Sequence, residues 1–261
     1  MVDVGGDLLL VDCGAGAAHR LAEAGHDGRA LRRIFITHLH SDHITGIPDL
    51  LWGGWVARWW QVPPVIVGPP GTADFVSKLL DAFSYDIRVR SAHGWKEENL
   101  RPEVREVEEG WTEKGAEWTV RAFRVAHEPV DEAFGYRVDA DNASLGISGD
   151  TRVSENLVRH TQGVDLLLHE VISRRGYLAR AEAEARAGRT VELARGVLNY
   201  HTPSDEVGGV AARAGAKRLV LSHLVLAAST VEQLAVDARV GYEGPLTVGD
   251  DLASFEVGGK S

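Results

Sequence analysis

The chain has little of several residue types, and each shortage excludes a class of protein. Its 261 residues include a single cysteine, Cys13, so no intrachain disulfide can form. No apolar run is long enough to span a membrane as a helix. Lysine and arginine total 28 against 38 aspartates and glutamates, and the net charge of −10 disfavours a basic nucleic-acid-binding face.

The N-terminus lacks the charged segment and following apolar segment that form a secretory signal. This lack favours a cytoplasmic protein. The sequence nevertheless opens almost directly in the apolar run DLLLVD, which is consistent with the loss of an upstream strand or targeting signal. Cys13 follows that run, and its apolar neighbours predict a buried, unreactive thiol.

Short apolar runs bounded by glycine, proline or aspartate predict strands at residues 7–12, 33–37, 64–68, 118–126, 133–139, 143–150, 164–170, 216–223 and 252–257. Helical patterns occupy residues 46–60, 71–83, 174–188, 202–215 and 229–240. We expect Thr72 to cap the second helix and Thr202 the fourth, with Pro203 at its first position. The mixture, without repeats or a linker, predicts one layered α/β domain over residues 1–261.

The stretch ITHLHSDHITG concentrates potential metal ligands in one short loop. A strand before this loop would present His38 and His40 on the same side, and Asp42 and His43 follow in a turn. Imidazole and carboxylate groups suit Zn²⁺, and manganese or iron are also compatible. Four such groups exceed what one tetrahedral ion readily takes from one loop, so we expect two neighbouring ions.

Three strand ends offer the remaining ligands. His127 follows one predicted strand, Asp150 ends another and His223 ends a third. A rigid scaffold holds a site at such positions, and the two oxygens of the Asp150 carboxylate could bridge two ions. The alternative interpretation of these motifs is a solvated polar turn and ordinary loop residues.

These motifs resemble those of the metallo-β-lactamase superfamily. THLHSDHITG is similar to the H-x-H-x-D-H signature of that fold, LLLVDCGAG to its LLxDxG strand, and GISGD and LVLSH to its later ligand strands. The resemblance implies a four-layer αββα sandwich with two metal ions at one edge of the sheets. It also implies the following ligand sets: His38, His40 and His127 for one ion; Asp42, His43 and His223 for the other; Asp150 as the bridge; and Asp12 as a supporting carboxylate.

Two further segments, LLLHEV and NYHTPSDEV, resemble the ribonuclease Z branch, which includes arylsulfatase-like and phosphodiesterase-like members. The resemblance implies that Glu170 orients His201, which would donate a proton to the leaving group. A carboxylate behind an imidazole fixes its tautomer and raises its basicity. His169 is expected to be structural. The alternative is that Glu170 and His201 are ordinary loop residues.

The sequence departs from that branch in two places. The short interval between His127 and Asp150 leaves no room for the protruding arm of tRNA-processing members. Together with the acidic charge, this predicts that tRNA is an unlikely partner. The longer interval after Glu170 contains a helical pattern, so residues 171–200 are expected to form a lid-like insertion.

Tryptophans gather in the helix expected after residues 36–46, the stretch ITHLHSDHITG, which we call the metal loop. Trp52, Trp55 and Trp59 fall roughly on one face of that helix, with Trp60 next to them. Such a face is most simply a packed core surface. The alternatives are an aromatic wall of a binding site or a homodimer patch.

The combined pattern predicts a hydrolase with two zinc ions, whose bridging hydroxide attacks small ester substrates, most of all phosphodiesters. Asp42 would bind one ion and orient the nucleophile. A lactonase or a carboxylic or sulfate ester hydrolase on the same site is the alternative enzyme, and β-lactam hydrolysis has no specific support. Alternatives of other classes are a metal-dependent binding or sensor protein without turnover, and a redox protein with one iron.

Overall fold

The computed structural model describes residues 1–26, 28–188, 190 and 192–258. The chain divides into two compact units, Met1–Glu108 and Glu109–Ser261. No helix among the described residues has the length and apolar character needed to cross a membrane. The prediction of a single domain over residues 1–261 stays a prediction.

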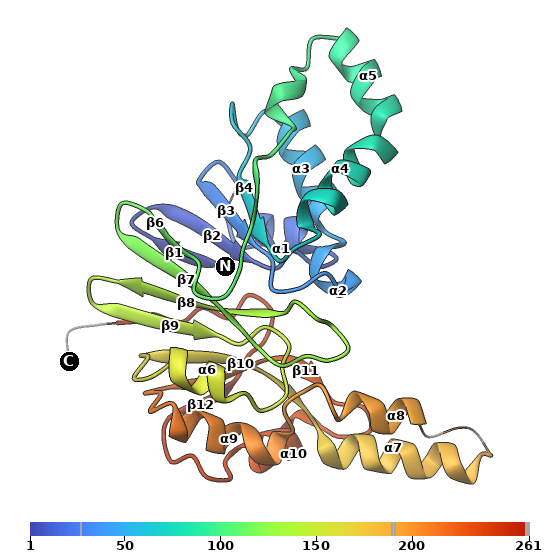
Figure 1. Ribbon diagram of the computed structural model, residues 1–261, viewed down its shortest axis with the longest axis vertical. Coiled ribbons are helices and arrows are strands. Elements are labelled where there is room, and N and C mark those ends of the chain that lie inside the picture. Colours follow the sequence, from blue (N-terminus) through green and yellow to red (C-terminus); the bar gives the residue numbers. More distant parts are fainter. Residues whose placement is uncertain (27, 189, 191, 259–261) are drawn as a thin grey trace. The chain divides into compact units, whose positions relative to one another are not determined.

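The first unit is built on a five-stranded sheet. Its strands, in spatial order, are β1 (Val2–Val4), β2 (Asp7–Val11), β3 (Leu31–Phe35), β4 (Val65–Gly68) and β5 (Val104–Glu106). β1 and β2 are antiparallel, and the other neighbours are parallel. The connecting helices are α1 (Ala17–Glu23), α2 (Ser41–Ile44), α3 (Ile47–Val56), α4 (Thr72–Ala82) and α5 (Ser84–Ala92). Helices α3 and α4 lie against one face of this sheet, where Leu50 and Val76 share a buried core with Ile34 (Figure 1).

The second unit contains a seven-stranded sheet in the order β12-β11-β10-β9-β8-β7-β6. The strands are β6 (Thr112–Lys114), β7 (Trp118–Arg124), β8 (Phe134–Ala140), β9 (Ala143–Ile147), β10 (Leu166–Ile172), β11 (Leu219–Val225) and β12 (Leu246–Val248). Strands β6 to β9 form an antiparallel meander, whereas β9 to β12 are parallel. The sheet therefore changes from hairpin connections to helical crossovers at β9.

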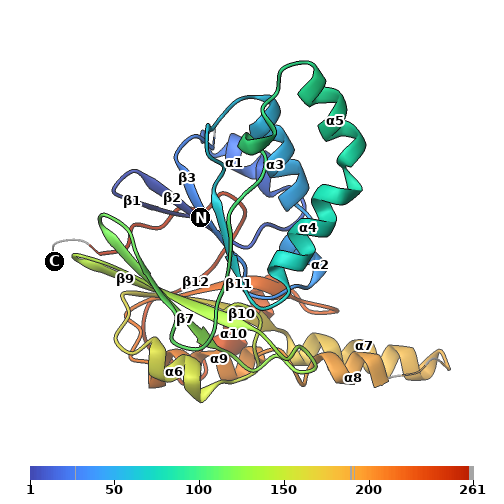
Figure 2. The same ribbon diagram turned by 45° about the horizontal axis from the view of Figure 1, so that its top comes forward.

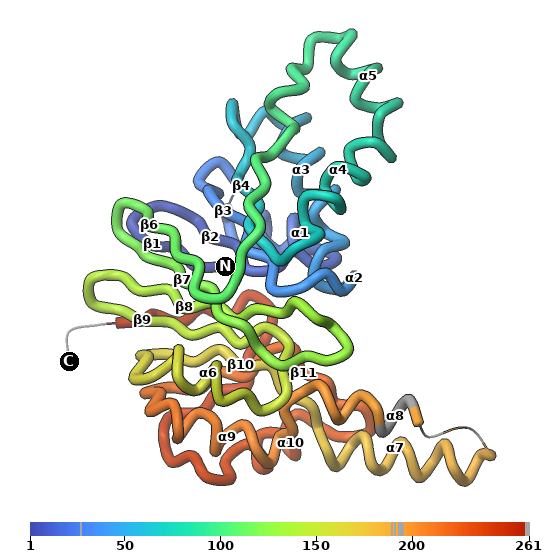
Figure 3. Tube along the Cα trace, viewed as in Figure 1, coloured from blue at the N-terminus to red at the C-terminus, as the bar shows by residue number. Residues whose placement is uncertain are grey.

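Helices α6 (Glu155–His160), α9 (Ser204–Arg213) and α10 (Val231–Ala238) cover one face of this second sheet (Figure 2). Leu157, Val210 and Leu234 from these helices share a buried core with Leu167 and Leu221 of the sheet. Helices α7 (Arg174–Arg186) and α8 (Glu192–Val197) form a hairpin that projects from the sheet (Figure 3). They supply the helices predicted within residues 171–200, and a lid role for them stays a prediction.

The structure corrects several expectations. Residues 252–257 form no strand, and the last strand is β12 at Leu246–Val248. Thr72 does not cap α4, because its hydroxyl donates to the Pro69 carbonyl at 2.6 Å. Thr202 does not cap α9, because its hydroxyl donates to the Thr151 carbonyl at 2.6 Å and Pro203 takes the N-cap position. A threonine hydroxyl is both donor and acceptor, so its position alone does not decide its role.

Candidate metal centre

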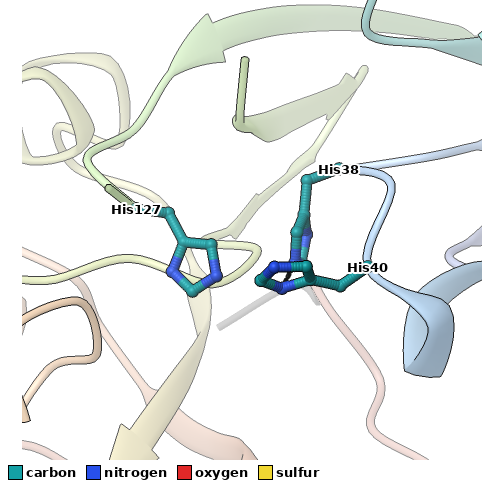
Figure 4. Close-up of side chains that lie close together, drawn as sticks. All are labelled: His38, His40 and His127. Carbon is teal, nitrogen blue, oxygen red and sulfur yellow. Dashed lines mark hydrogen bonds between the residues drawn. The ribbon is translucent and has the colours of Figure 1, made fainter. Parts of the chain in front are cut away.

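The first unit carries the N-terminal cluster, which consists of His38, His40, Asp42 and His43. These residues follow the end of β3 and run into the short helix α2. His38 and His43 are buried, while the Asp42 side chain is 63% exposed. Nε2 of His38 lies 2.9 Å from Nδ1 of His40, with their rings nearly perpendicular (Figure 4). The loop therefore brings imidazole nitrogens together, as the sequence predicted.

Asp12 supports this cluster from the end of β2. Its carboxylate accepts hydrogen bonds from the Thr37 backbone N–H at 2.8 Å and from the Thr37 hydroxyl at 2.9 Å. The same carboxylate lies 2.7 Å from Nδ1 of His43. A carboxylate at Nδ1 holds the proton there and leaves Nε2 as the electron-pair donor for a metal. Asp12 adopts a left-handed backbone conformation with φ of 58°, which places its side chain in this position.

The loop after Asp12 packs tightly against the metal loop. The Cys13 N–H donates to the His43 carbonyl at 2.8 Å, and the Gly46 N–H donates to the Cys13 carbonyl at 2.8 Å. A Cβ atom on Gly14 would lie 2.2 Å from the Asp42 carbonyl oxygen, so this contact requires glycine. Cys13 is fully buried, as predicted, and burial raises the pKa of its thiol to about 12.

The second unit carries the C-terminal cluster, which consists of His127, Asp150, Glu170, His201 and His223. Oδ2 of Asp150 lies 3.5 Å from Nε2 of His223 and 3.9 Å from Nε2 of His127. Nδ1 of His127 donates to the Tyr200 carbonyl at 2.8 Å, since a carbonyl can only accept. This bond keeps the ring proton of His127 on Nδ1, so that the lone pair lies on Nε2, the nitrogen on the side of the Asp150 carboxylate.

His223 owes its position to an irregularity in β11. The pairing of β10 with β11 shifts between Glu170 and Val171, so that Ser222 and Leu224 have partners and His223 is the extra residue. His223 has a left-handed φ of 45°. A bulge of this kind turns one side chain out of the regular alternation. Sequence alternation alone gives no signal for it.

Glu170 is almost completely buried beside His201. Its Oε1 accepts hydrogen bonds from the backbone N–H groups of Thr151 at 3.1 Å and Thr202 at 2.9 Å, and lies 3.2 Å from Nδ1 of His201. Burial, and then the nearby charge of Asp150, raise the pKa of the Glu170 carboxyl well above its usual value. The predicted pair of Glu170 and His201 is therefore side by side.

His169 points away from this pair. Its Nδ1 donates to the Glu170 carbonyl at 2.7 Å, and the side chain is buried. Burial lowers the pKa of His169 to about 4, so the ring is neutral at physiological pH. These contacts fit the structural role that the sequence predicted for it.

Two overlapping groups in the second unit have ligand atoms within 4.8 Å of one another. One contains His127, Asp150 and His201, and the other contains Glu170, His201 and His223. His201 was predicted as a proton donor, not a ligand, and the sequence held no signal for this second possibility. Imidazole nitrogens with carboxylate oxygens are a donor set for zinc, manganese or iron.

Comparisons with known proteins identify the family. The family model of the anti-Pycsar protein Apyc1 matches residues 1–182. Ribonuclease Z of Mycobacterium bovis is 34% identical over 264 residues, covering 98% of this chain and 90% of the relative. Ribonuclease Z of Mycobacterium sp. strain KMS is 38% identical over 263 residues, covering 98% and 88%. The chain belongs to the anti-Pycsar Apyc1 family, within the ribonuclease Z branch of the metallo-β-lactamase superfamily.

Solved structures show the same fold. The metallo-β-lactamase fold protein YhfI of Bacillus subtilis gives a TM-score of 0.71 at 20% identity, covering 95% of this chain and 87% of that one. The short form of human tRNase Z gives 0.71 at 22% identity, covering 98% and 90%. The predicted αββα fold class and the predicted metal-dependent hydrolase are confirmed.

The expectation that tRNA is an unlikely partner is wrong. It conflicts with relatives that carry the name ribonuclease Z and align with nearly the whole chain. The arm is indeed absent between His127 and Asp150, where β8 and β9 form a hairpin. However, a missing arm does not exclude other contacts, and a net charge is a sum that says nothing about local surfaces.

Proposed function

We propose that the chain is a phosphodiester hydrolase whose two clusters contribute ligands to one centre of two zinc ions. His38, His40 and His127 would hold one ion, Asp42, His43 and His223 the other, and Asp150 would bridge them. The observation that carries this proposal is that two of the imidazoles have a hydrogen-bond partner at Nδ1. Asp12 holds Nδ1 of His43 and the Tyr200 carbonyl holds Nδ1 of His127, so each ring offers Nε2 to a metal.

Zinc ions held by these residues would supply a nucleophilic water at neutral pH and polarise the phosphoryl oxygen. The exposed Asp42 carboxylate would accept a hydrogen bond from that water and orient it. His201 would give a proton to the leaving oxygen, since Glu170 lies 3.2 Å from its Nδ1 and can hold the ring in place. The backbone N–H groups of Thr151 and Thr202 fix Glu170 itself.

The relatives support phosphodiesters over other esters. A ribonuclease cleaves the phosphodiester bonds of RNA, and proteins of that name align with 98% of this chain. RNA is therefore a candidate substrate beside small phosphodiesters. Lactone or sulfate ester hydrolysis on the same residues remains the alternative activity, and a binding protein without turnover remains the alternative of another class.

The experiment that tests the proposal measures initial rates of the zinc-loaded protein on a panel of substrates. The panel holds bis(4-nitrophenyl) phosphate, a 3′,5′-cyclic nucleotide, an RNA with a 3′ extension and a medium-chain lactone. We expect phosphodiester turnover to exceed lactone turnover and to disappear on chelation and in Asp150→Ala. The control is Asp139→Ala, since Asp139 lies on β8 in an ion pair with Arg137. Dominant lactone turnover, or no turnover on any member, would contradict the proposal.

A further inference from the structure

Two tryptophans, Trp55 of α3 and Trp60 just beyond its C-terminal end, hydrogen-bond to a second segment of the first unit. Trp55 and Trp60 are buried, which confirms the predicted core role for these two. The Trp55 indole N–H donates to the Lys96 carbonyl at 2.7 Å, and the Trp60 indole N–H donates to the Asn99 carbonyl at 3.0 Å. Residues 95–99 are therefore held rigidly beside the C-terminal end of α3.

A small hollow of about 170 Å³ lies at this junction, entirely within the first unit. It is lined by Trp55, Arg58, Gln61, Gly94, Trp95, Lys96 and Asn99. No acidic side chain is among these residues, and two of them carry positive charge. Sites for whole small molecules usually measure ~300 Å³ or more, so this hollow suits a single chemical group.

Arg58 occupies a backbone position that favours glycine. Its φ is 55°, and it follows α3 at the point where the chain closes the helix, with the Arg58 N–H donating to the Trp55 carbonyl at 3.1 Å. The residue just past a helix end is usually glycine when its φ is positive, and another residue there costs about 1 kcal/mol. An arginine at this unfavourable backbone position points to a function of its side chain.

The Arg58 guanidinium lies over an aromatic ring of the same unit. Its guanidinium carbon lies 5.3 Å from the centre of the Trp95 ring, which orients the planar group. Among the described residues, no carboxylate lies within ion-pair distance of Arg58. The Lys96 ammonium lies 3.8 Å from Glu98, a long ion pair between two exposed side chains. The hollow thus has hydrogen-bond donors and a net positive charge.

We propose that this hollow binds a phosphate group. The Arg58 fork can donate two parallel hydrogen bonds to phosphate oxygens, Lys96 adds charge, and Gln61 and Asn99 offer amide donors. The site would take either the free phosphate of a small ligand or one backbone phosphate of a polynucleotide. The second case rests on the proposed function. Since α3 has 10 residues and begins shortly after the metal loop, its far end is about 15 Å away, too far for the scissile phosphate itself.

The test uses the metal-free protein and inorganic phosphate, with the Trp95 indole N–H observed by NMR. We expect a saturable shift with phosphate that sodium chloride of equal ionic strength does not produce. Arg58→Gly should weaken phosphate binding at least about tenfold, since a charge-assisted bidentate contact is lost. The variant should fold well, because glycine relieves the strained backbone. Leu252→Gly is the matched control, as Leu252 is exposed with φ of 63°.

A second arm identifies the source of the phosphate group. Binding of a fluorescent RNA to the metal-free protein is compared between the wild type and Arg58→Gly. RNA binding weakened about tenfold would assign the site to a polynucleotide, whereas loss of inorganic phosphate binding alone would assign it to a small ligand. Equal shifts with chloride, or an unchanged response in Arg58→Gly, would overturn the proposal. Failure of the proposed function would instead show as absent turnover with phosphate binding intact.

Discussion

The carboxylate of Asp12 lies 2.7 Å from Nδ1 of His43 and also accepts two hydrogen bonds from Thr37. One half-buried carboxylate thus ties the end of β2 to the loop that carries the N-terminal cluster and orients the His43 ring. Asp12 is not expected to touch substrate. Its effect on function would act through the metal affinity of the N-terminal cluster.

Asp12→Asn should lower zinc affinity by about 10- to 100-fold, because the amide cannot hold the proton on Nδ1 of His43 as a carboxylate does. Competition with a chelating dye measures this affinity directly. Asp7→Asn, on the same strand, is the control. Unchanged zinc affinity in Asp12→Asn would show that the contact with His43 has no role in metal binding.

His201→Ala should slow turnover according to the leaving group. A donor that protonates the leaving oxygen contributes about 100-fold or more for a poor leaving group, and little for nitrophenolate, which leaves without a proton. Rates on a phenyl and a nitrophenyl phosphodiester separate the two cases, and zinc content is measured in parallel. Equal losses on both substrates, together with lost zinc, would make His201 a ligand instead.

His169 should make the fold sensitive to acid. Its pKa is lowered from 6.5 to about 4 in the folded protein, so between these values the unfolded chain binds a proton that the folded chain does not. Its contribution to stability is therefore complete above about pH 6.5 and is lost as the pH falls to about 4. The loss is roughly 3 kcal/mol.

Urea unfolding of metal-free wild type and His169→Gln across this pH range measures the effect. The glutamine amide can still donate to the Glu170 carbonyl but does not titrate. The difference in unfolding free energy between the two proteins should change with pH below 6.5. A difference in unfolding free energy that does not change with pH would show that His169 is protonated equally in the folded and unfolded states.

Gly14→Ala should destabilise the protein and impair zinc binding. The added Cβ would lie 2.2 Å from the Asp42 carbonyl oxygen, so the metal loop must move, at a cost of roughly 1–3 kcal/mol. Gly53→Ala is the matched control, because a Cβ there has no atom within 4 Å and alanine favours α3 by up to about 1 kcal/mol. Thermal unfolding of both variants, with and without zinc, separates the loss of stability from the loss of zinc binding. Equal behaviour of both variants would contradict the packing argument.

The two clusters of candidate metal ligands stand out in the sequence because several metal-binding side chain types fall close together or at the ends of apolar runs. Four candidate ligands, three histidines and one aspartate, fall within His38–His43, and the later candidates lie in or shortly after apolar runs that do form strands. Strands β1, β5, β6 and β12 could not be predicted, since three residues are too few to show an alternating pattern. Short strands depend on pairing with a neighbour, which a single-sequence pattern does not contain.

Other features depend on contacts between distant residues. The bulge at His223 exists only in the pairing of β10 with β11. The role of Arg58 requires both its positive φ and its stacking on Trp95, which lies far along the chain. The prediction that tRNA is an unlikely partner was wrong for a similar reason, because the net charge contains no information on where charged side chains lie on the surface.

The proposed centre of two zinc ions is tested most directly by the rate of bis(4-nitrophenyl) phosphate hydrolysis as a function of bound zinc per chain. Wild type and Asp150→Ala are compared, with zinc counted by elemental analysis of each sample. We expect wild-type activity to rise to a maximum at two zinc ions per chain, and Asp150→Ala to be inactive at any loading. Full activity at one ion per chain, or activity that survives in Asp150→Ala, would contradict it.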